Sequence, residues 1–304
     1  MLAIIIPYYK INFFERTLLS VENQTDKRFR LYIGNDASPD NPESLISGIL
    51  LTTDYQYVHY QENLGGKNLV KQWERVINET DKEQWIMILG DDDELDPNVV
   101  EEFYKDLPRV EQQQISLFKF SQLAIDESGE TIREATVLPE LYSSMKFLED
   151  RFTKAFPNSL SEHIFSRKTF EKYGFKNFPL AWHSDDLAIL EFADLKNFRF
   201  NSTAKVRVRI SRHSISGQDN SDIRKQKATY EFCEYLLSKY HGKLNLAFIN
   251  VLVKQYREII WRNGFLLTVN LPKIYLKRKN MMGFLKAVKI QRELKKRISD
   301  LANK

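Results

Sequence analysis

Four acidic residues follow directly after a short apolar run in the sequence. Residues 85–89 have the composition of a buried strand, and after one glycine come Asp91, Asp92, Asp93 and Glu94. Adjacent carboxylates repel one another, and divalent cations that prefer oxygen ligands relieve this repulsion while bridging phosphates. Open α/β sheets bind ligands at the carboxyl ends of their strands. The cluster therefore predicts a Mg²⁺ or Mn²⁺ site for a phosphorylated ligand, with a solvated acidic turn as the alternative.

A second polar turn follows another apolar segment. Residues 29–33 have the branched and aromatic composition of a strand, and they lead into a turn that contains Asp36 and Asp40. Asp, Asn and Ser build turns without any other function, so this pattern alone is a weak signal. If residues 29–33 and 85–89 are neighbouring parallel strands, both turns face one crevice. A carboxylate there accepts hydrogen bonds from a base or a ribose.

These turns need a sheet to position them, and the first third of the sequence predicts one. Apolar runs rich in branched residues alternate with the helical patterns of residues 13–23 and 69–77, as in a mostly parallel sheet covered by helices. Strands are expected at residues 2–6, 29–33, 55–60 and 84–89, with a fifth at 115–121. Crossovers between parallel strands are right-handed in nearly all cases, so a nucleotide-binding α/β sheet is the leading topology.

The pattern becomes helical in the last third of the chain. Residues 199–210 alternate like a strand, whereas residues 221–241 and 245–263 show helical periodicity. We therefore expect an α/β domain at residues 1–217 and a smaller helical region at residues 218–304.

Composition narrows the class of protein further. The chain has 304 residues, of which 42% are hydrophobic and 12% aromatic, which is typical of a globular protein and not of a disordered one. The single cysteine, Cys233, excludes an intramolecular disulfide and fits a reducing compartment. Residues 1–7 lack the basic flank and cleavage site of a signal peptide, and the longest other apolar stretch, residues 244–253, is too short to span a membrane. We therefore expect a cytoplasmic protein.

Basic residues are concentrated in the tail at residues 273–304. This segment contains 11 Lys or Arg against only Glu293 and Asp300, which predicts an acidic partner, either a membrane surface or nucleic acid. No aromatic residues alternate with the basic ones, so a nucleic-acid partner is not expected. An apolar stripe favours a helix lying on an anionic membrane, with a helix packed on the domain as the alternative. The stripe consists of Leu285, Val288, Leu294, Ile298 and Leu301.

Five motifs occur in order within the first hundred residues. They are Ile4-Ile5-Ile6-Pro7-Tyr8-Tyr9, Leu18-Leu19-Ser20-Val21-Glu22-Asn23-Gln24-Thr25, Asn35-Asp36-Ala37-Ser38-Pro39-Asp40, Asn63-Leu64-Gly65-Gly66 and Leu89-Gly90-Asp91-Asp92-Asp93-Glu94-Leu95-Asp96-Pro97. With these motifs the sequence resembles family 2 of the inverting glycosyltransferases, which has the GT-A fold. The resemblance implies a donor half at about residues 1–120 and an acceptor half at about residues 121–217. It becomes weaker after residue 120.

The resemblance implies roles for the residues that match the family's motifs. Pro7 and Tyr9 would line the nucleotide pocket, and Asp36 would hydrogen-bond the base. Asp92 would contact the ribose, and Asp93 would hold the metal on the diphosphate.

The sequence departs from the family pattern at Gly90, where the family commonly has an Asp before its metal-binding pair. Asp91 is displaced by one position, which leaves the division of donor-binding roles among Asp91, Asp92 and Asp93 open. Lys67 falls near a family segment that often supplies a basic residue to the nucleotide, and a simple surface position is the alternative.

Two later segments match the family's catalytic parts. Inverting transfer needs a base that removes the acceptor proton, and in this family it lies in an acidic pair that opens a helix. Asp186 matches this position best and Asp185 is the second choice, while a helix cap is the alternative for both. His213 resembles a histidine that joins the metal or the diphosphate. The nearby arginines, Arg207, Arg209 and Arg212, would suit an anionic diphosphate.

The resemblance thus implies a metal-dependent inverting glycosyltransferase, with Mg²⁺ or Mn²⁺ as cofactor and a nucleotide diphosphate sugar, expected to be a UDP-sugar, as donor. The acceptor would be a hydroxyl of a glycan or lipid-linked molecule in polysaccharide biosynthesis, at the inner face of the membrane. An inactive homologue that binds sugar nucleotides is the main alternative. A Mg²⁺-dependent phosphohydrolase is less well supported, because residues 91–95 lack the Thr or Val of its common signature and no phosphate-binding Gly-rich loop is present.

Overall fold

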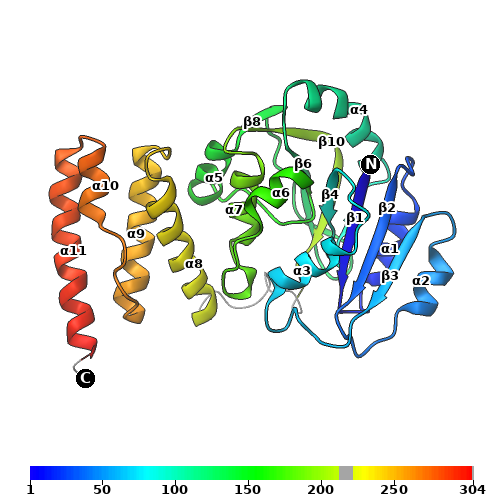
Figure 1. Cartoon of the computed structure of the whole chain (residues 1–304), viewed down its shortest axis with the longest axis horizontal. Helices are drawn as coiled ribbons and strands as arrows, with labels where there is room; N and C mark the ends of the chain where they lie inside the picture. Colours follow the sequence, from blue (N-terminus) through cyan, green and yellow to red (C-terminus); the bar gives the residue numbers. More distant parts are fainter. Residues whose placement is uncertain (212–221, 303–304) are drawn as a thin grey trace. The chain divides into compact units, whose positions relative to one another are not determined.

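The computed structural model of the chain describes residues 1–211 and 222–302 (Figure 1). The chain forms two compact units. The first contains Met1–Asn177 and Ser184–Gln218, and the second contains Phe178–His183 and Asp219–Lys304. The short segment Phe178–His183 therefore leaves the first unit and the chain then returns to it, which the sequence pattern did not indicate.

A single mixed sheet forms the centre of the first unit. Its strands are β1 (Leu2–Tyr8), β2 (Phe29–Asn35), β3 (Tyr55–His59), β4 (Trp85–Ile88), β5 (Glu94–Leu95), β6 (Leu117–Ile125), β7 (Thr131–Arg133), β8 (Leu141–Ser143), β9 (His163–Ser166) and β10 (Asn197–Arg209). The main strand order is β3-β2-β1-β4-β9-β6-β10-β5. The strands β3, β2, β1 and β4 are parallel, whereas β9 is antiparallel to both β4 and β6. The expected mostly parallel sheet is confirmed, and β9 is an addition.

Helices cover both faces of this sheet. They are α1 (Phe14–Glu22), α2 (Glu43–Ile49), α3 (Leu69–Asn78), α4 (Val99–Gln112), α5 (Ser144–Thr153), α6 (Arg167–Tyr173) and α7 (Ser184–Phe192). Apolar residues of α1, α2 and α4 share one core with Leu2, Ile4 and Ile6 of β1. Because side chains alternate along a strand, Ala3 and Ile5 face the other side. The central strands are buried on both faces, which explains their continuous apolar runs.

The second unit is helical. It contains a 3₁₀ turn (Pro179–Ala181), α8 (Ile223–Tyr235), a π-helical segment (Leu236–Tyr240), α9 (Leu246–Asn263), α10 (Leu271–Lys277) and α11 (Met281–Ala302). Tyr230 of α8 stacks on Tyr256 of α9, with ring centroids 5.2 Å apart. His183 stacks on Phe232, which places this histidine in the packing of the second unit. Within the described residues, every helix falls short of the length and apolar character that crossing a membrane requires.

Candidate active site

Three parallel strands end at one edge of the sheet, and hydrogen bonds join the segments that follow them. β1 pairs with β2 on one side and with β4 on the other. After β4, the Asp91 carboxylate accepts hydrogen bonds at 2.7 Å from the backbone N–H groups of Tyr9 and Lys10. After β2, the Asp36 N–H donates to the Tyr8 carbonyl at 3.0 Å. The two acidic turns therefore flank the end of β1, where open α/β sheets bind their ligands.

The three aspartates of the turn after β4 have different surroundings. Asp93 is 5% exposed, and its carboxylate accepts from the Arg209 backbone N–H at 2.9 Å and from the Ser161 hydroxyl. Burial, followed by the charge of Asp92, raises the pKa of Asp93 well above its ordinary value. The Asp92 side chain accepts no hydrogen bond from another described residue. Burial and the charge of Asp91 raise the pKa of Asp92 to about 6.

This turn fits a divalent cation on chemical grounds. The raised pKa values show that burial and mutual repulsion disfavour the charged carboxylates, and a cation with oxygen ligands removes that cost. No side chain among the described residues donates to the Asp92 oxygens, whereas Asp93 accepts from the Ser161 hydroxyl and the Arg209 N–H. In the described part of the chain, no three His, Cys, Asp or Glu side chains form a complete metal site. Two expected contributors, Arg212 and His213, lie outside the described residues.

Gly90 has a steric reason to be glycine. A Cβ at this position would lie 2.8 Å from the Asp93 carboxylate and 3.2 Å from that of Asp92, closer than ordinary van der Waals contact. The Gly90 N–H donates to the Ser161 hydroxyl at 3.0 Å, which fixes the turn at this close approach. The departure from the family pattern therefore lets Asp93 fold back over the backbone of its own turn.

The end of β10 ties the acidic turn to the sheet through Arg209, which is 1% exposed. Its guanidinium donates to the Asp92 carbonyl at 3.1 Å and to the Asp126 carbonyl at 2.5 Å, and it pairs with the Glu94 carboxylate. Arg207 pairs with Asp96 at 3.2 Å. The expectation that these two arginines serve a diphosphate is not supported, because both are already bound to acidic residues or carbonyls of the same unit.

These two arginines also provide a matched test of the turn's stability. We expect Arg209→Met to lower the free energy of unfolding by about 3–5 kcal/mol, because it leaves the partly buried Glu94 carboxylate without its charged partner and removes the hydrogen bonds to the Asp92 and Asp126 carbonyls. Arg207→Met is the control, since the Arg207 side chain is 43% exposed and such surface pairs contribute about 0–1 kcal/mol. Urea unfolding followed by circular dichroism measures both variants. Equal losses would show that Arg209 is no more important than a surface arginine.

Asp36 organises the loop that follows β3. Its carboxylate accepts from the backbone N–H groups of Leu64 and Gly65, both at 2.7 Å, and it pairs with Arg75. The Arg75 guanidinium lies 3.7 Å from the centre of the Tyr60 ring. Asp36 is 3% exposed, and its carboxylate already binds the loop. A nucleotide base that hydrogen-bonds Asp36, as predicted, would have to contact this buried carboxylate in addition to its existing partners.

The other residues predicted to bind the donor are Pro7, Tyr9 and Lys67, which lie near the end of β1 and in the turn before α3. Pro7 is half-buried in β1, and Tyr9 is 40% exposed just after it. Lys67 is exposed in the turn before α3, and its N–H donates to the Leu64 carbonyl at 3.0 Å. Neither the side chain of Lys67 nor that of Tyr9 is joined to the acidic turn by a hydrogen bond within the described residues.

A second acidic group lies at the start of α7. Asp186 is 2% exposed, and its carboxylate accepts from Arg151 Nε at 3.1 Å and from Asn158 Nδ2 at 3.2 Å. The same Asn158 nitrogen donates to Asp185 at 3.4 Å. Burial, followed by the charge of Asp186, raises the pKa of Asp185 to about 8. The pair can therefore hold and release a proton near neutral pH.

Lys119 sets the orientation of Asn158. The buried Lys119 Nζ donates to Asn158 Oδ1 at 3.2 Å and to Glu162 Oε1 at 2.6 Å. Since the Asn158 oxygen accepts from Lys119, its NH₂ group faces Asp185 and Asp186. Burial lowers the pKa of Lys119. Sequence reasoning missed this network because its members come from separate elements and no local motif marks them.

The segment before β9 connects the two acidic groups. Ser161 donates to Asp93 of the turn after β4, and the neighbouring Glu162 binds Lys119, which in turn holds Asn158. Glu162 is fully buried, and its carboxylate also accepts from the Ser159 N–H at 2.8 Å. The segment just before the additional strand β9 thus carries one side chain toward each acidic group. Hydrogen bonds through this segment connect the predicted metal turn with the predicted base pair.

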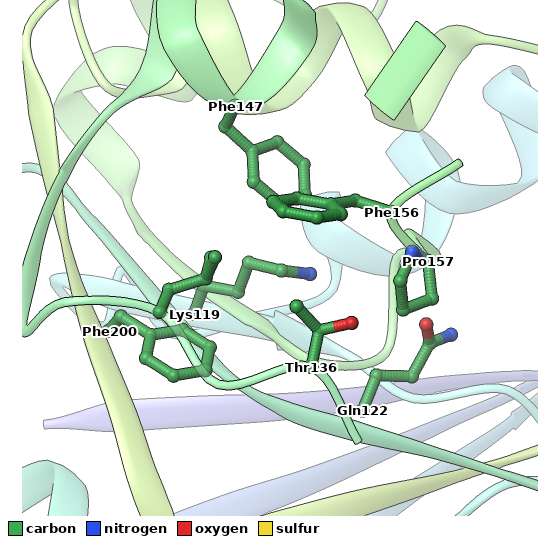
Figure 2. Close-up of a pocket in the computed structure, with 8 residues that line it drawn as sticks. Lys119, Gln122, Thr136, Phe147, Phe156, Pro157 and Phe200 are labelled. Atoms are coloured by element: carbon green, nitrogen blue, oxygen red, sulfur yellow. The ribbon is translucent and has the colours of Figure 1, made fainter. Parts of the chain in front are cut away.

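A small cavity lies beside this network (Figure 2). The space in it that can hold a water molecule is about 10 Å³, roughly enough for one water, so the cavity is too small for a nucleotide sugar. Gln122 Oε1, at its wall, has no hydrogen-bond partner within the described residues. The cavity is lined by Lys119, Gln122, Thr136, Leu138, Phe147, Phe156, Pro157 and Phe200.

Solved structures share this architecture at low sequence identity. S. aureus TarS 1-349 in complex with UDP-GlcNAc superposes with a TM-score of 0.60 at 12% identity, covering 96% of this chain and 91% of TarS 1-349. The mannosyltransferase PcManGT from Pyrobaculum calidifontis, in complex with GDP-Man and Mn²⁺, has a TM-score of 0.56 at 13% identity, covering 99% and 78%. GalNAc-T7 with UDP, GalNAc and Mn²⁺ has a TM-score of 0.53 at 10% identity, covering 87% and 56%. The expected GT-A fold is therefore confirmed.

The family itself is shown by the sequence. No curated protein matches the chain significantly. The model of the family described as glycosyl transferase family 2 matches residues 3–173, more than half of the chain. This match spans β1 to β9 and includes both the acidic turn after β4 and the Lys119–Asn158–Glu162 network. The chain therefore belongs to glycosyl transferase family 2 and is a glycosyltransferase.

Proposed function

We propose that this glycosyltransferase moves a sugar from a nucleotide diphosphate sugar to an acceptor hydroxyl with inversion at the transferred carbon. The observation that supports the proposal most is the connection of two buried acidic groups through Ser161 and Glu162. One group suits a cation on a diphosphate, and the other suits a general base. The structural neighbours that hold UDP-GlcNAc or GDP-Man favour a nucleotide sugar as donor. We propose specifically that the donor is a UDP-sugar and that the acceptor belongs to glycan or polysaccharide biosynthesis.

On the donor side, Asp92 and Asp93 would hold Mg²⁺ or Mn²⁺, and two of the structural neighbours contain Mn²⁺. The cation supplies charge neutralisation for the departing diphosphate. Asp91 fixes the backbone of Tyr9 and Lys10 at the edge where the donor would bind. Pro7, Tyr9, Asp36 and Lys67 remain the other proposed donor contacts.

On the acceptor side, Asp186 or Asp185 would take the proton of the attacking hydroxyl. Asn158 donates to both carboxylates, and Arg151 pairs with Asp186, so both hold the acidic pair in place. Asp186 agrees best with the family position. Asp185 is the more accessible of the two, which keeps it as the second candidate.

Donor binding is the direct test of this proposal. We expect a UDP-sugar with Mn²⁺ to raise the unfolding temperature of the protein, because a ligand that binds only the folded state stabilises it. A panel of UDP- and GDP-sugars, each with Mn²⁺ and with EDTA, is measured by differential scanning fluorimetry. If no nucleotide sugar stabilises the protein in the presence of Mn²⁺, the proposed donor class is wrong.

Turnover separates the enzyme from the two alternatives. A transferase releases the nucleoside diphosphate only together with a glycosylated product. A phosphohydrolase instead releases inorganic phosphate, and an inactive homologue binds the donor without turnover. Mass spectrometry of the products formed from the stabilising donor and a mixture of glycan acceptors distinguishes the three outcomes.

A further inference from the structure

The turn between α10 and α11 presents an unusual surface of the second unit. α11 approaches α10 so closely that a Cβ at Gly283 would lie 2.3 Å from the Tyr275 ring, so only glycine fits there. The Asn280 side chain accepts from the Gly283 N–H at 2.7 Å, and the Asn280 N–H donates to the Tyr275 carbonyl at 3.0 Å. Lys279 has a left-handed backbone, with φ of 54°. These contacts together hold the turn between α10 and α11 in one defined conformation.

Four large apolar side chains flank this turn and are exposed. They form what we call the turn patch: Leu276 (54% exposed), Met281 (62%), Met282 (71%) and Leu285 (63%). Single exposed apolar residues are ordinary on protein surfaces, but several within ten residues of sequence mark an interaction site.

The surroundings of the turn patch are strongly basic. Between residues 271 and 292 the sequence contains seven Lys or Arg and no Asp or Glu. The first acid after this stretch, Glu293, is paired with Arg257 at 3.3 Å. The exposed lysines near the patch in sequence include Lys277, Lys279, Lys286 and Lys289.

The apolar stripe expected to face a membrane does not supply this surface. Leu294 is fully buried, and Val288, Ile298 and Leu301 are half-buried, as expected for a helix that packs within its own unit. Leu285 alone among the stripe residues is exposed. The apolar surface available to a partner is therefore the turn patch and not the length of α11.

We propose that the turn patch docks on an anionic phospholipid bilayer, with its methionines and leucines entering the interface and the surrounding lysines contacting lipid phosphates. Interfacial elements combine exposed apolar side chains with basic residues in this way. Lysine stems are apolar, so their ammonium groups reach phosphates while the stems follow the patch into the interface. A second copy of the chain is a poorer partner, because it would bring like-charged lysines together. Nucleic acid is also a poorer partner, because the turn patch contains no aromatic side chain on which bases could stack.

Vesicle sedimentation of the full chain tests the proposal. We expect binding to vesicles of phosphatidylcholine with 30% phosphatidylglycerol at low salt and little binding to phosphatidylcholine alone. Changing Met281, Met282 and Leu285 together to Gln should lower the bound fraction about tenfold or more, and so should changing Lys277, Lys279, Lys286 and Lys289 together to Glu. High salt should weaken binding of the unchanged protein, because it screens surface charge.

The control changes Leu51 and Val137 to Gln, two side chains of the first unit that are 77% and 74% exposed. This variant should bind anionic vesicles like the unchanged protein. Circular dichroism confirms that all variants are folded. The proposal fails if the unchanged protein ignores anionic vesicles, or if the turn-patch variants bind as well as the control. It also fails if sedimentation velocity shows a dimer that the Gln variant abolishes, since the patch would then be an interface between two copies.

Discussion

Asp186→Asn is expected to lower kcat by on the order of 10² to 10⁴ while donor affinity stays nearly unchanged. Asparagine keeps the shape of the side chain and can still bond to its neighbours, but it cannot accept a proton. A base acts in the transition state on the acceptor hydroxyl, so its loss should not affect the binding of the donor. Transfer rate and donor affinity are measured side by side, with circular dichroism to confirm folding.

Asp185→Asn is the matched comparison for this experiment. Asp185 is more exposed than Asp186, and the hydrogen bond that it accepts from Asn158 is longer, at 3.4 Å against 3.2 Å for Asp186. If Asp185→Asn is the inactive variant, the base is one residue earlier in the chain. If both variants keep nearly normal activity, the acidic pair only caps α7 and the proposed mechanism fails.

The dependence of kcat/KM on pH is a further test of the acidic pair. If Asp185 and Asp186 had only a structural role, their titration would not appear in this dependence. The base acts in its deprotonated form, so kcat/KM should fall as pH decreases below the apparent pKa of the pair, which the Asp185 value of about 8 places near neutral to slightly basic pH. Asn158→Ala removes donors that favour the charged carboxylates, so it should shift this fall to higher pH. Arg151, Lys119, Glu162 and His163 also face the pair and remain in place in this variant.

Asp92→Ala is expected to weaken metal-dependent binding of UDP by about 100-fold or more, since even outer-shell partners of metal ligands affect affinity by about 10–100-fold. The side chain makes no hydrogen bond to another described residue, so the thermal stability of the free protein should not decrease. Isothermal titration calorimetry of UDP with Mn²⁺ and with EDTA measures the effect. Unchanged metal-dependent binding in Asp92→Ala would remove this residue from the site.

Asp93→Ala distinguishes metal binding from support of the turn. It should also abolish the dependence on metal, but it additionally removes the acceptor for the Ser161 hydroxyl and the Arg209 N–H. We therefore expect a lower unfolding temperature for Asp93→Ala than for Asp92→Ala. Equal stability of the two variants would contradict the different surroundings that the structure gives them.

The sequence by itself determined the parallel part of the sheet and the family. Mostly apolar runs at β1, β2 and β4, separated by helical patterns, are sufficient to predict parallel strands, because strands buried on both faces are apolar along nearly their whole length. The acidic turn after β4 and the motif order were also visible, since they are local features. The acidic pair at the start of α7 could be named for the same reason.

The tertiary structure decided which of these residues are free to act. Asp93 and Arg209 are 116 positions apart, and Lys119 and Glu162 are 43 apart, so no local pattern shows that they are partners. The sequence predicted that Arg207 and Arg209 could bind a diphosphate, but in the structure they pair with Asp96 and Glu94. The apolar stripe of α11 was likewise predicted to face a membrane, but most of it packs inward, and the turn patch is exposed instead. Periodicity states which side chains share a face, but only packing decides which faces are covered, because burial depends on elements that are distant in the chain.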